Sequence, residues 1–243
     1  MKPCLLIPIY NHGATIDRVV QALAPLGLPC FIVDDGSDDQ TATVLDDLEA
    51  RFPWVHVERR EQNGGRGEAL RLGYRLAARS GFSHVVQLDA DGQHDPRDVP
   101  AMLCAARRRP DALVLGVPIF GRDAPRLRRF GHSLSRFWVH VETCSLEIGD
   151  PLSGLRCLPL TPTLRLLNRV PCGTRMDFDP EIVVRLLWAG LPVVNVPTRV
   201  RYFPNGISHF DPFWDNLRIS WLHTRLFFEM LPRSPGLLMR RLR

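Results

Sequence analysis

Short apolar runs alternate with helical patterns along the first half of the chain, and this alternation limits the fold more than any other feature. The apolar runs cover residues 4–9, 30–33, 55–57, 85–88 and 112–117. Between the first four runs, apolar residues recur at helical spacing over 16–23, 44–48 and 69–76. Strands that alternate with helices form βαβ units. The sequence therefore predicts an α/β fold with a mostly parallel central sheet flanked by helices.

The second half is less regular. Residues 120–143 combine a Pro and Gly entry with basic and aromatic residues, which predicts a helical insertion over the carboxyl edge of the sheet. A polar turn from Asp150, "DPLSGLR", leads to another strand, and a helix over 180–189 precedes a last strand at 192–196. We predict a catalytic domain over 1–210, followed by a C-terminal amphipathic helix and basic tail over 211–243.

The helix predicted over 213–231 places Phe213, Leu217, Trp221, Leu226 and other apolar residues at helical spacing, with charged residues on its other side. Such a stripe commonly packs against the rest of a domain. Large aromatic residues and a basic tail also suit a helix that lies in a bilayer interface. The sequence leaves both alternatives open, and both can hold for different parts of the face.

The chain carries a formal net charge of +5 over 243 residues, and the basic residues are concentrated at 107–109, 126–136 and 239–243. Such groups suit a phosphate-bearing partner or an anionic membrane, although scattered solvated arginines would look the same. No segment has the pattern of a nucleic-acid-binding motif, so we expect no nucleic-acid partner. The six cysteines form no C-x-x-C pair, and the first apolar run is too short for a secretory segment. We expect reduced, mostly buried thiols and a cytoplasmic protein, peripheral at the inner face of the plasma membrane.

Acidic residues follow the strand predicted at 85–88, in the stretch "QLDADGQHDP". Asp89 and Asp91 are two positions apart at a strand end, so both carboxylates can turn toward one edge of the sheet. Oxygen ligands with open positions suit Mg²⁺ or Mn²⁺ shared with a diphosphate, and Gln93 can add a neutral oxygen. The alternative is a solvated acidic turn in which Asp89 caps a helix.

A second acidic turn, "VDDGSDDQT", follows the strand at 30–33. Asp34 and Asp35 could cap the next helix. Their position beside "PIYN", where the first strand ends, favours a nucleotide site instead, because a carboxylate there can accept from a base or a ribose hydroxyl. The glycine-rich loop "NGGRGEAL" lacks the full dinucleotide and P-loop patterns. It can still let the backbone pass close to a nucleotide.

These stretches, "IPIYNHGATI", "VDDGSDDQT", "NGGRGEAL" and "QLDADGQHDP", resemble in order and spacing the nucleotide-sugar half of inverting family 2 glycosyltransferases with the GT-A fold. "GDPLSGLRCLP" is similar to the D-x-x-S-G-F-R stretch of polyprenyl-phosphate sugar synthases, with Leu155 in place of the usual aromatic residue. The resemblance covers roughly residues 2–208.

The resemblance implies a nucleotide-sugar donor and a role for each matching residue. It assigns Pro8, Tyr10 and Asp35 to the nucleoside. Asp89 and Asp91 would hold the divalent metal and the donor diphosphate, with Gln93 matching the D-x-D-x-Q form. We place Asn11 and Arg66 in the same donor site. Arg156 would face the acceptor.

"DFDPEIVVRLLWAG" is similar to the helix entry that supplies the catalytic base in many relatives. Aligning Arg185 and Gly190 places Asp179 at the base position, and Asp177 is the second candidate. A hydroxyl acceptor would need such a base. A lipid phosphate is already an anion and would need none, and Asp179 could then pair with Arg185 or cap the helix.

The segment after residue 200 departs from the R-x-x-G-x-S pattern of the mannose synthases and resembles a bacterial family 2 subgroup found in aryl-polyene-type envelope clusters. His209 there could act near the diphosphate or be structural. We expect His132, Trp138 and His140 to pack rather than bind ligands. The function indicated is metal-dependent, inverting sugar transfer to an envelope lipid or lipid-linked acceptor. A polyprenyl-phosphate sugar synthase and a non-catalytic nucleotide-binding scaffold are the alternatives, and the oligomeric state stays open.

Overall fold

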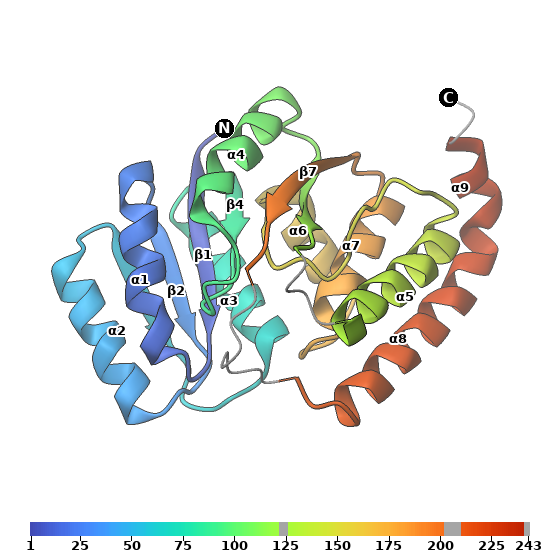
Figure 1. Cartoon of the computed structure of the whole chain (residues 1–243). Helices are drawn as coiled ribbons and strands as arrows, with labels where there is room; N and C mark the ends of the chain where they lie inside the picture. Colours follow the sequence, from blue (N-terminus) through green and yellow to red (C-terminus); the bar gives the residue numbers. More distant parts are fainter. Residues whose placement is uncertain (122–125, 202–209, 241–243) are drawn as a thin grey trace.

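The computed structural model describes residues 1–121, 126–201 and 210–240. Its strands are β1 (Pro3–Ile9), β2 (Cys30–Asp34), β3 (Val55–Arg59), β4 (His84–Gln87), β5 (Leu113–Ile119), β6 (Arg156–Pro159) and β7 (Val193–Arg199). They form one sheet in the order β3-β2-β1-β4-β6-β5-β7, of which Figure 1 labels β2, β1, β4 and β7 from left to right. All neighbouring pairs are parallel except those of β6, which runs antiparallel to β4 and β5. The predicted mostly parallel α/β sheet is confirmed.

The antiparallel strand decides where the site can form. β6 begins with Arg156, which lies opposite Gln87 at the last position of β4. The turn that leads into β6 therefore lies at the same edge of the sheet as the residues that follow β4. Parallel strands β1 and β2 also end at this edge, at Ile9 and Asp34.

Helices cover both faces of the sheet. Helices α1 (Gly13–Leu23), α2 (Asp39–Arg51) and α4 (Val99–Arg108) share a core with one face, and α3 (Arg66–Arg79) and α7 (Phe178–Trp188) share a core with the other. Alternate residues of β1 divide between the two cores, because successive side chains of a strand point to opposite faces. The helices α5 (Arg126–Thr143), α6 (Leu160–Leu167), α8 (Trp214–Met230) and α9 (Ser234–Arg240) complete the described fold, with short 3-10 turns at Ala24–Leu26, Pro96–Asp98 and Leu231–Arg233.

The sequence patterns do not predict α4 and α6, and they place the N-cap of α2 too early in the chain. Both helices carry a proline in their first turn, Pro100 and Pro162, where a missing N–H costs no helical hydrogen bond. Helix α2 is capped by Asp38, whose carboxylate accepts from the N–H of Thr41 at 2.8 Å. The capping role considered for Asp34 and Asp35 is therefore wrong.

All six cysteines are free, and four of them are buried, as expected. Burial raises the pKa of the Cys4 and Cys157 thiols to about 12, which keeps them protonated and unreactive. Among the described helices, none combines the length and the apolar character needed to cross a bilayer.

The inner face of α8 packs against α5 and α7. Leu222 and Leu226 belong to the core that α7 shares with the sheet. His223 Nδ1 lies 2.7 Å from the buried carboxylate of Glu142 on α5. Trp221, two residues before His223, is exposed, so the described part of the chain covers one face of α8. The packing alternative is confirmed for this face, whereas the domain boundary after residue 210 stays a prediction.

We expect Glu229→Gln to loosen α8 from α7. Glu229 accepts from both Nη atoms of Arg185, at 2.8 and 3.0 Å, and these hydrogen bonds lower its pKa. A lowered carboxyl pKa contributes stability above the unfolded-state value and loses it as the pH falls through the folded value. The free energy of unfolding should fall by about 1–2 kcal/mol at neutral pH. In urea titrations the difference should disappear in acid, and a pH-independent difference would contradict the ion pair as its cause.

Candidate active site

The acidic stretch after β4 faces a pocket at the carboxyl edge of the sheet. Asp89, Asp91, Gln93 and His94 line this pocket from one side. Helix α5 supplies Arg128 and His132 to the same pocket, and the turn before β6 supplies Leu152, Ser153 and Gly154. Segments from the two halves of the chain thus form one site.

Asp89 is held by two cationic or potentially cationic side chains. Arg66 Nη2 lies 2.5 Å from Asp89 Oδ1, and His94 Nε2 lies 3.7 Å from Asp89 Oδ2. Burial alone would raise the pKa of Asp89, but the charge of Arg66 and the contact with His94 outweigh it and lower the pKa. Asp89 is therefore an anion in the free protein.

Asp91 lies in the opposite electrostatic situation. Its Oδ1 accepts from the N–H of Gln93 at 2.9 Å. Burial, followed by repulsion from the Asp89 carboxylate, raises the pKa of Asp91. A cation placed between the two carboxylates would remove this repulsion.

The residues present fit a hard divalent ion. Asp89 and Asp91 offer carboxylate oxygens, and Gln93 offers an amide oxygen, which accepts from Arg128 Nη1 at 2.8 Å. Nowhere in residues 1–121, 126–201 and 210–240 do three His, Cys, Asp or Glu side chains surround one point. Two carboxylates with open positions suit Mg²⁺ or Mn²⁺, which retain water and substrate phosphates in their coordination shells.

Asp179, the candidate base, lies in the same network, although it is far from Asp89 in sequence. It stands in the first turn of α7 and is only 6% exposed. Arg66 Nε lies 2.5 Å from its Oδ2, and Arg156 Nη1 lies 3.3 Å from its Oδ1. Gln87 is placed toward it at 3.5 Å and is held by the hydroxyl of Tyr74 at 2.6 Å. The suggested pairing of Asp179 with Arg185 is not what the structure shows.

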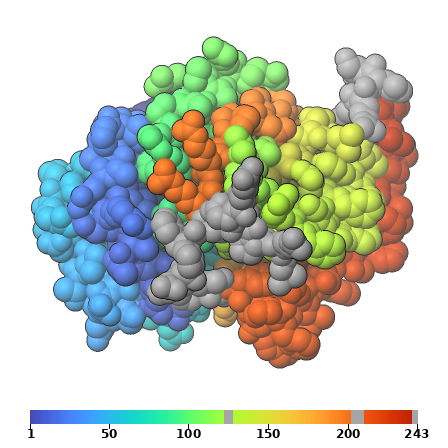
Figure 2. All heavy atoms as spheres, in the orientation of Figure 1, coloured from blue at the N-terminus to red at the C-terminus, as the bar shows by residue number. Residues whose placement is uncertain are grey.

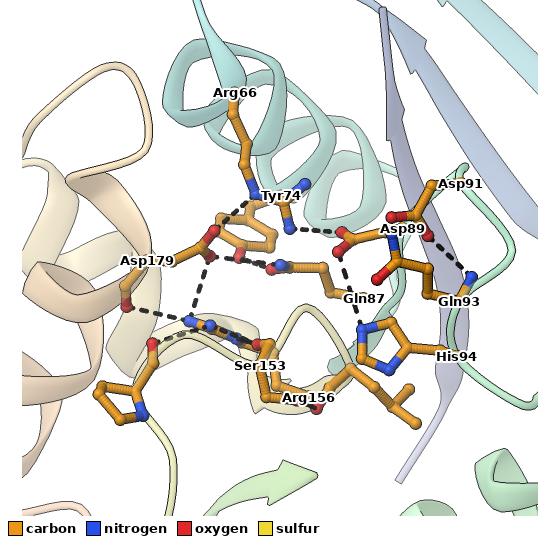
Figure 3. A network of polar contacts seen from close by, with 12 residues as sticks. Arg66, Tyr74, Gln87, Asp89, Asp91, Gln93, His94, Ser153, Arg156 and Asp179 are labelled. Atoms are coloured by element: carbon orange, nitrogen blue, oxygen red, sulfur yellow. Dashed lines mark hydrogen bonds and ion pairs between the residues drawn. The ribbon is translucent and has the colours of Figure 1, made fainter. Parts of the chain in front are cut away.

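Arg66 joins the two carboxylates. Figure 3 shows its guanidinium between Asp179 and Asp89, with one nitrogen directed to each. Both carboxylates raise the pKa of Arg66 against the effect of its burial. A donor phosphate or metal ion bound at Asp89 would have to compete with this ion pair or rearrange it.

Arg156 is fully buried and does not face an open acceptor side, which corrects the expectation from the resemblance. Its guanidinium donates to the carbonyl oxygens of Pro151, Ser153 and Asp179, at distances between 2.6 and 3.3 Å. These contacts hold the turn before β6 against the start of α7. Arg156 is therefore a positioning residue in this structure.

The turn before β6 is in contact with Asp89 through Gly154. A Cβ atom on Gly154 would overlap the Asp89 carboxyl group. Only glycine lets the "SGLR" segment approach Asp89 this closely. Leu155, which replaces the usual aromatic residue, is buried in the core that β1 shares with α1 and α4.

Asp35 organises the glycine-rich loop. Its Oδ1 accepts from the N–H of Gly64 at 3.1 Å, its Oδ2 accepts from the N–H of Gly65 at 2.7 Å, and Arg60 forms an ion pair with it. Gly65 has a φ of +97°, which favours glycine. The structure thus places Asp35 beside the loop that the sequence analysis associates with a nucleotide, with both of its oxygens already accepting hydrogen bonds.

Asn11 links the first two strand ends. Its N–H donates to Ser37 Oγ at 2.9 Å, and its Oδ1 accepts from the N–H of Asp38 at 2.8 Å. Asn11 has a φ of +53°, in the left-handed region that asparagine tolerates. Pro8 is buried in β1, and Tyr10 is half-buried. The predicted nucleoside residues therefore lie together at one edge, beside the acidic turn after β2.

The Asp177 carboxylate accepts from the N–H of Arg175, two residues before it, at 3.1 Å. The structure does not bring it into the Arg66 network. His209 and residues 202–208 of the segment that carries the aryl-polyene resemblance lie outside the described residues. Trp138 and His140 pack as expected, with His140 Nε2 2.9 Å from the Ile148 carbonyl oxygen.

Helix α5 contributes to the site, although His132 was expected only to pack. His132 lines the pocket, and its Nδ1 lies 2.6 Å from Asp150 Oδ2. Arg128, one helical turn earlier, lines the same pocket. The signal that could have revealed them is their i, i+4 spacing, which puts both side chains on one face of a helix.

Comparisons with known proteins decide the family to which this site belongs. The family described as Glycosyl transferase family 2 matches residues 4–171, more than half of the chain. The chain belongs to glycosyl transferase family 2. It is therefore a glycosyltransferase, as the resemblance implies.

Two relatives are similar to this chain over most of the length of both proteins. The polyprenol monophosphomannose synthase of Mycolicibacterium smegmatis is 33% identical over 217 residues, which are 85% of this chain and 80% of the relative. The UDP-N-acetylglucosamine--dolichyl-phosphate N-acetylglucosaminyltransferase of Methanococcus voltae is 34% identical over 249 residues, covering 96% of each.

Solved structures support the fold. The mannosyltransferase PcManGT from Pyrobaculum calidifontis, in complex with GDP-Man and Mn²⁺, is similar with a TM-score of 0.59 at 16% identity, covering 98% of this chain and 74% of that one. S. aureus TarS 1-349 in complex with UDP-GlcNAc has a TM-score of 0.63 at 16% identity, covering 93% of this chain and 66% of that one. The predicted GT-A fold of this family 2 glycosyltransferase is confirmed.

Proposed function

We propose that this glycosyltransferase uses Mg²⁺ or Mn²⁺ to transfer a sugar from a nucleotide-sugar donor to a polyprenyl-phosphate acceptor, with inversion, at the inner face of the plasma membrane. The observation that carries the proposal is the pocket itself. It is lined by the carboxylates of Asp89 and Asp91, by the amide of Gln93 and by the cationic side chain of Arg128, which donates to Gln93 Oε1 at 2.8 Å. Carboxylates that can hold a divalent ion and a nearby guanidinium suit a phosphate-bearing substrate.

Two lines of similarity support the choice of substrates. Relatives at 33–34% identity are named for sugar transfer to polyprenol or dolichyl phosphates. The related fold of PcManGT holds GDP-Man and Mn²⁺. Pro8, Tyr10, Asn11 and Asp35 would bind the nucleoside at the ends of β1 and β2.

Asp89, Asp91 and Gln93 would hold the metal, which when bound supplies positive charge to the leaving nucleoside diphosphate. Arg66 is placed to move from the two carboxylates to a donor phosphate, since guanidinium groups pair well with phosphate oxygens. Arg128 and His132 would contact the acceptor phosphate on the opposite wall of the pocket.

The environment of Asp179 favours a phosphate acceptor over a hydroxyl acceptor. Arg66 and Arg156 both pair with its carboxylate, so its charge is already neutralised and its oxygens already accept hydrogen bonds. A general base must be able to accept a proton from the acceptor. An acceptor phosphate is already an anion at neutral pH, so no proton has to be removed from it. Asp179 can then serve to hold Arg66 and Arg156 in place.

Isothermal titration with UDP-, GDP- and dTDP-sugars, each with Mn²⁺, with Mg²⁺ and with a chelator, tests the donor and the metal. We expect one donor to bind in the micromolar range, and only with metal. Lack of binding to every donor, in protein shown to be folded by circular dichroism, would contradict the proposal and favour the scaffold alternative.

The acceptor is tested by radiolabelled sugar transfer to undecaprenyl phosphate and to a lipid hydroxyl such as diacylglycerol. We expect product only with the phosphate. The pH profile of kcat should show no acidic limb that depends on Asp179, so the Asp179→Asn variant should keep the shape of the profile. Transfer to the hydroxyl lipid, with an acidic limb that Asp179→Asn abolishes, would establish Asp179 as a base and overturn the choice of acceptor.

A further inference from the structure

Helix α8 is apolar on two opposite faces, of which the fold covers one. Leu222, Leu226 and Met230 are buried on the inner face. On the other side, Trp214, Leu217, Trp221 and Phe228 follow one another at spacings of three, four and seven residues, which places them on one stripe. All four are exposed, Trp221 by 68% and Phe228 by 64%. Soluble domains rarely leave such a continuous aromatic stripe uncovered.

Helix α5 carries a second exposed stripe. Phe130, Leu134 and Phe137 recur at spacings of four and three residues, and all three are exposed. Arg128 and His132, on other sides of the same helix, line the active-site pocket. One helix therefore separates the pocket from this apolar stripe.

The two stripes lie on neighbouring helices. Ser135 Oγ of α5 is 3.3 Å from His223 Nε2 of α8. Cys144 Sγ, directly after the end of α5, is 3.8 Å from Met230 Sδ at the end of α8, so the helices run side by side in the same direction. Figure 1 shows them at one end of the molecule, and Figure 2 shows both at its surface. We call the two stripes together the α5–α8 surface.

The charges around the α5–α8 surface are mostly positive. Arg129 and Arg136 of α5 and Arg233 after α8 are exposed. The acidic residues of the two helices point inward: Glu142 and Asp215 are buried, and Glu229 is paired with Arg185. Exposed aromatic rings flanked by cations match the interface of a bilayer that contains anionic lipids. A protein partner would more commonly present a mixed polar rim.

We propose that the α5–α8 surface lies on an anionic lipid bilayer. This inference rests on the proposed function, because it explains how the pocket meets an acceptor that resides in the membrane. With Phe130, Leu134 and Phe137 among the lipid headgroups, Arg128 and His132 stand on the far side of the same helix. A lipid-borne phosphate then has only the width of one helix to cross to reach the pocket.

Vesicle sedimentation of the full chain tests the surface. We expect the chain to sediment with vesicles that contain phosphatidylglycerol and to remain largely in the supernatant with pure phosphatidylcholine. Trp214→Gln with Trp221→Gln should weaken binding at least about tenfold, because two large apolar side chains no longer enter the interface. Arg129→Gln with Arg136→Gln should weaken binding to the anionic vesicles and reduce its dependence on salt.

Arg107→Gln with Arg108→Gln is the matched control, since it removes two exposed arginines from α4 and should leave binding unchanged. Absence of sedimentation with either vesicle, or equal binding by all variants, would overturn the proposal. So would a dimer in light scattering that the tryptophan variant converts to monomer, because a second copy would then cover the surface.

Donor titration on the same variants separates this proposal from the proposed function. Intact donor binding without vesicle binding would contradict only the α5–α8 surface. Vesicle binding without any donor binding would contradict only the transferase substrates.

Discussion

Asp91→Asn is expected to lower kcat/KM at least about a hundredfold while leaving the metal-free protein as stable as the natural chain. The two effects separate because, among the residues that the structure describes, no cation lies as close to Asp91 as Arg66 lies to Asp89. Burial and the Asp89 charge also disfavour the ionised form of Asp91 and raise its pKa. Removing that charge relieves repulsion in the folded protein but takes one ligand from the metal. Activity assays with saturating Mn²⁺ and urea unfolding in a chelator measure the two quantities.

Asp89→Asn is the matched comparison. Asp89 is the partner of Arg66 at 2.5 Å, so its replacement should reduce both activity and stability. Equal loss of stability in the two variants would contradict the different environments of the two carboxylates. Near-normal activity of Asp91→Asn would contradict its role as a metal ligand.

Arg156→Met is expected to destabilise the fold by about 3–5 kcal/mol, the largest effect on stability that we predict. The side chain is fully buried, and its loss would leave three carbonyl oxygens, of Pro151, Ser153 and Asp179, without their donor. The Asp179 carboxylate would also lose one of its two cations. Urea unfolding followed by circular dichroism measures the change.

Arg97→Met provides the control for Arg156→Met. Arg97 also pairs with a carboxylate, Asp95 at 2.6 Å, but its side chain is 68% exposed. Exposed ion pairs contribute at most about 1 kcal/mol, so this variant should stay close to the natural chain. A small effect of Arg156→Met, similar to that of Arg97→Met, would show that Arg156 does not hold the turn before β6.

Local patterns predicted the strands and several helices because they depend on neighbouring residues. The apolar runs before Asp35 and Asp89 are short and continuous, as expected of strands buried on both faces. Helices α4 and α6 were not predicted, because a proline usually indicates that a helix ends or is broken. Pro100 and Pro162 lie in the first turn of their helices, where proline is tolerated. The spacing of apolar residues does not show whether a proline lies in the first turn of a helix or in its interior.

The sequence also predicted both apolar character and helical period for α8, but not the side on which it packs. Burial depends on residues of α5 and α7 that are far away in the chain, such as Glu142 and Arg185. Only the structure shows that His223 faces inward and that Trp221 faces outward. The two alternatives left open by the sequence therefore correspond to two faces of one helix.

The sequence by itself determined that two acidic turns follow buried strands and that two carboxylates, the proposed metal ligands, stand two positions apart. Parallel strands end at one edge, so these turns had to lie near each other. Only the tertiary structure decided that β6 runs antiparallel beside β4, which brings Gly154 against Asp89 and Arg156 beneath Asp179. Strand direction and pairing are set by contacts between distant segments, and no local pattern encodes them.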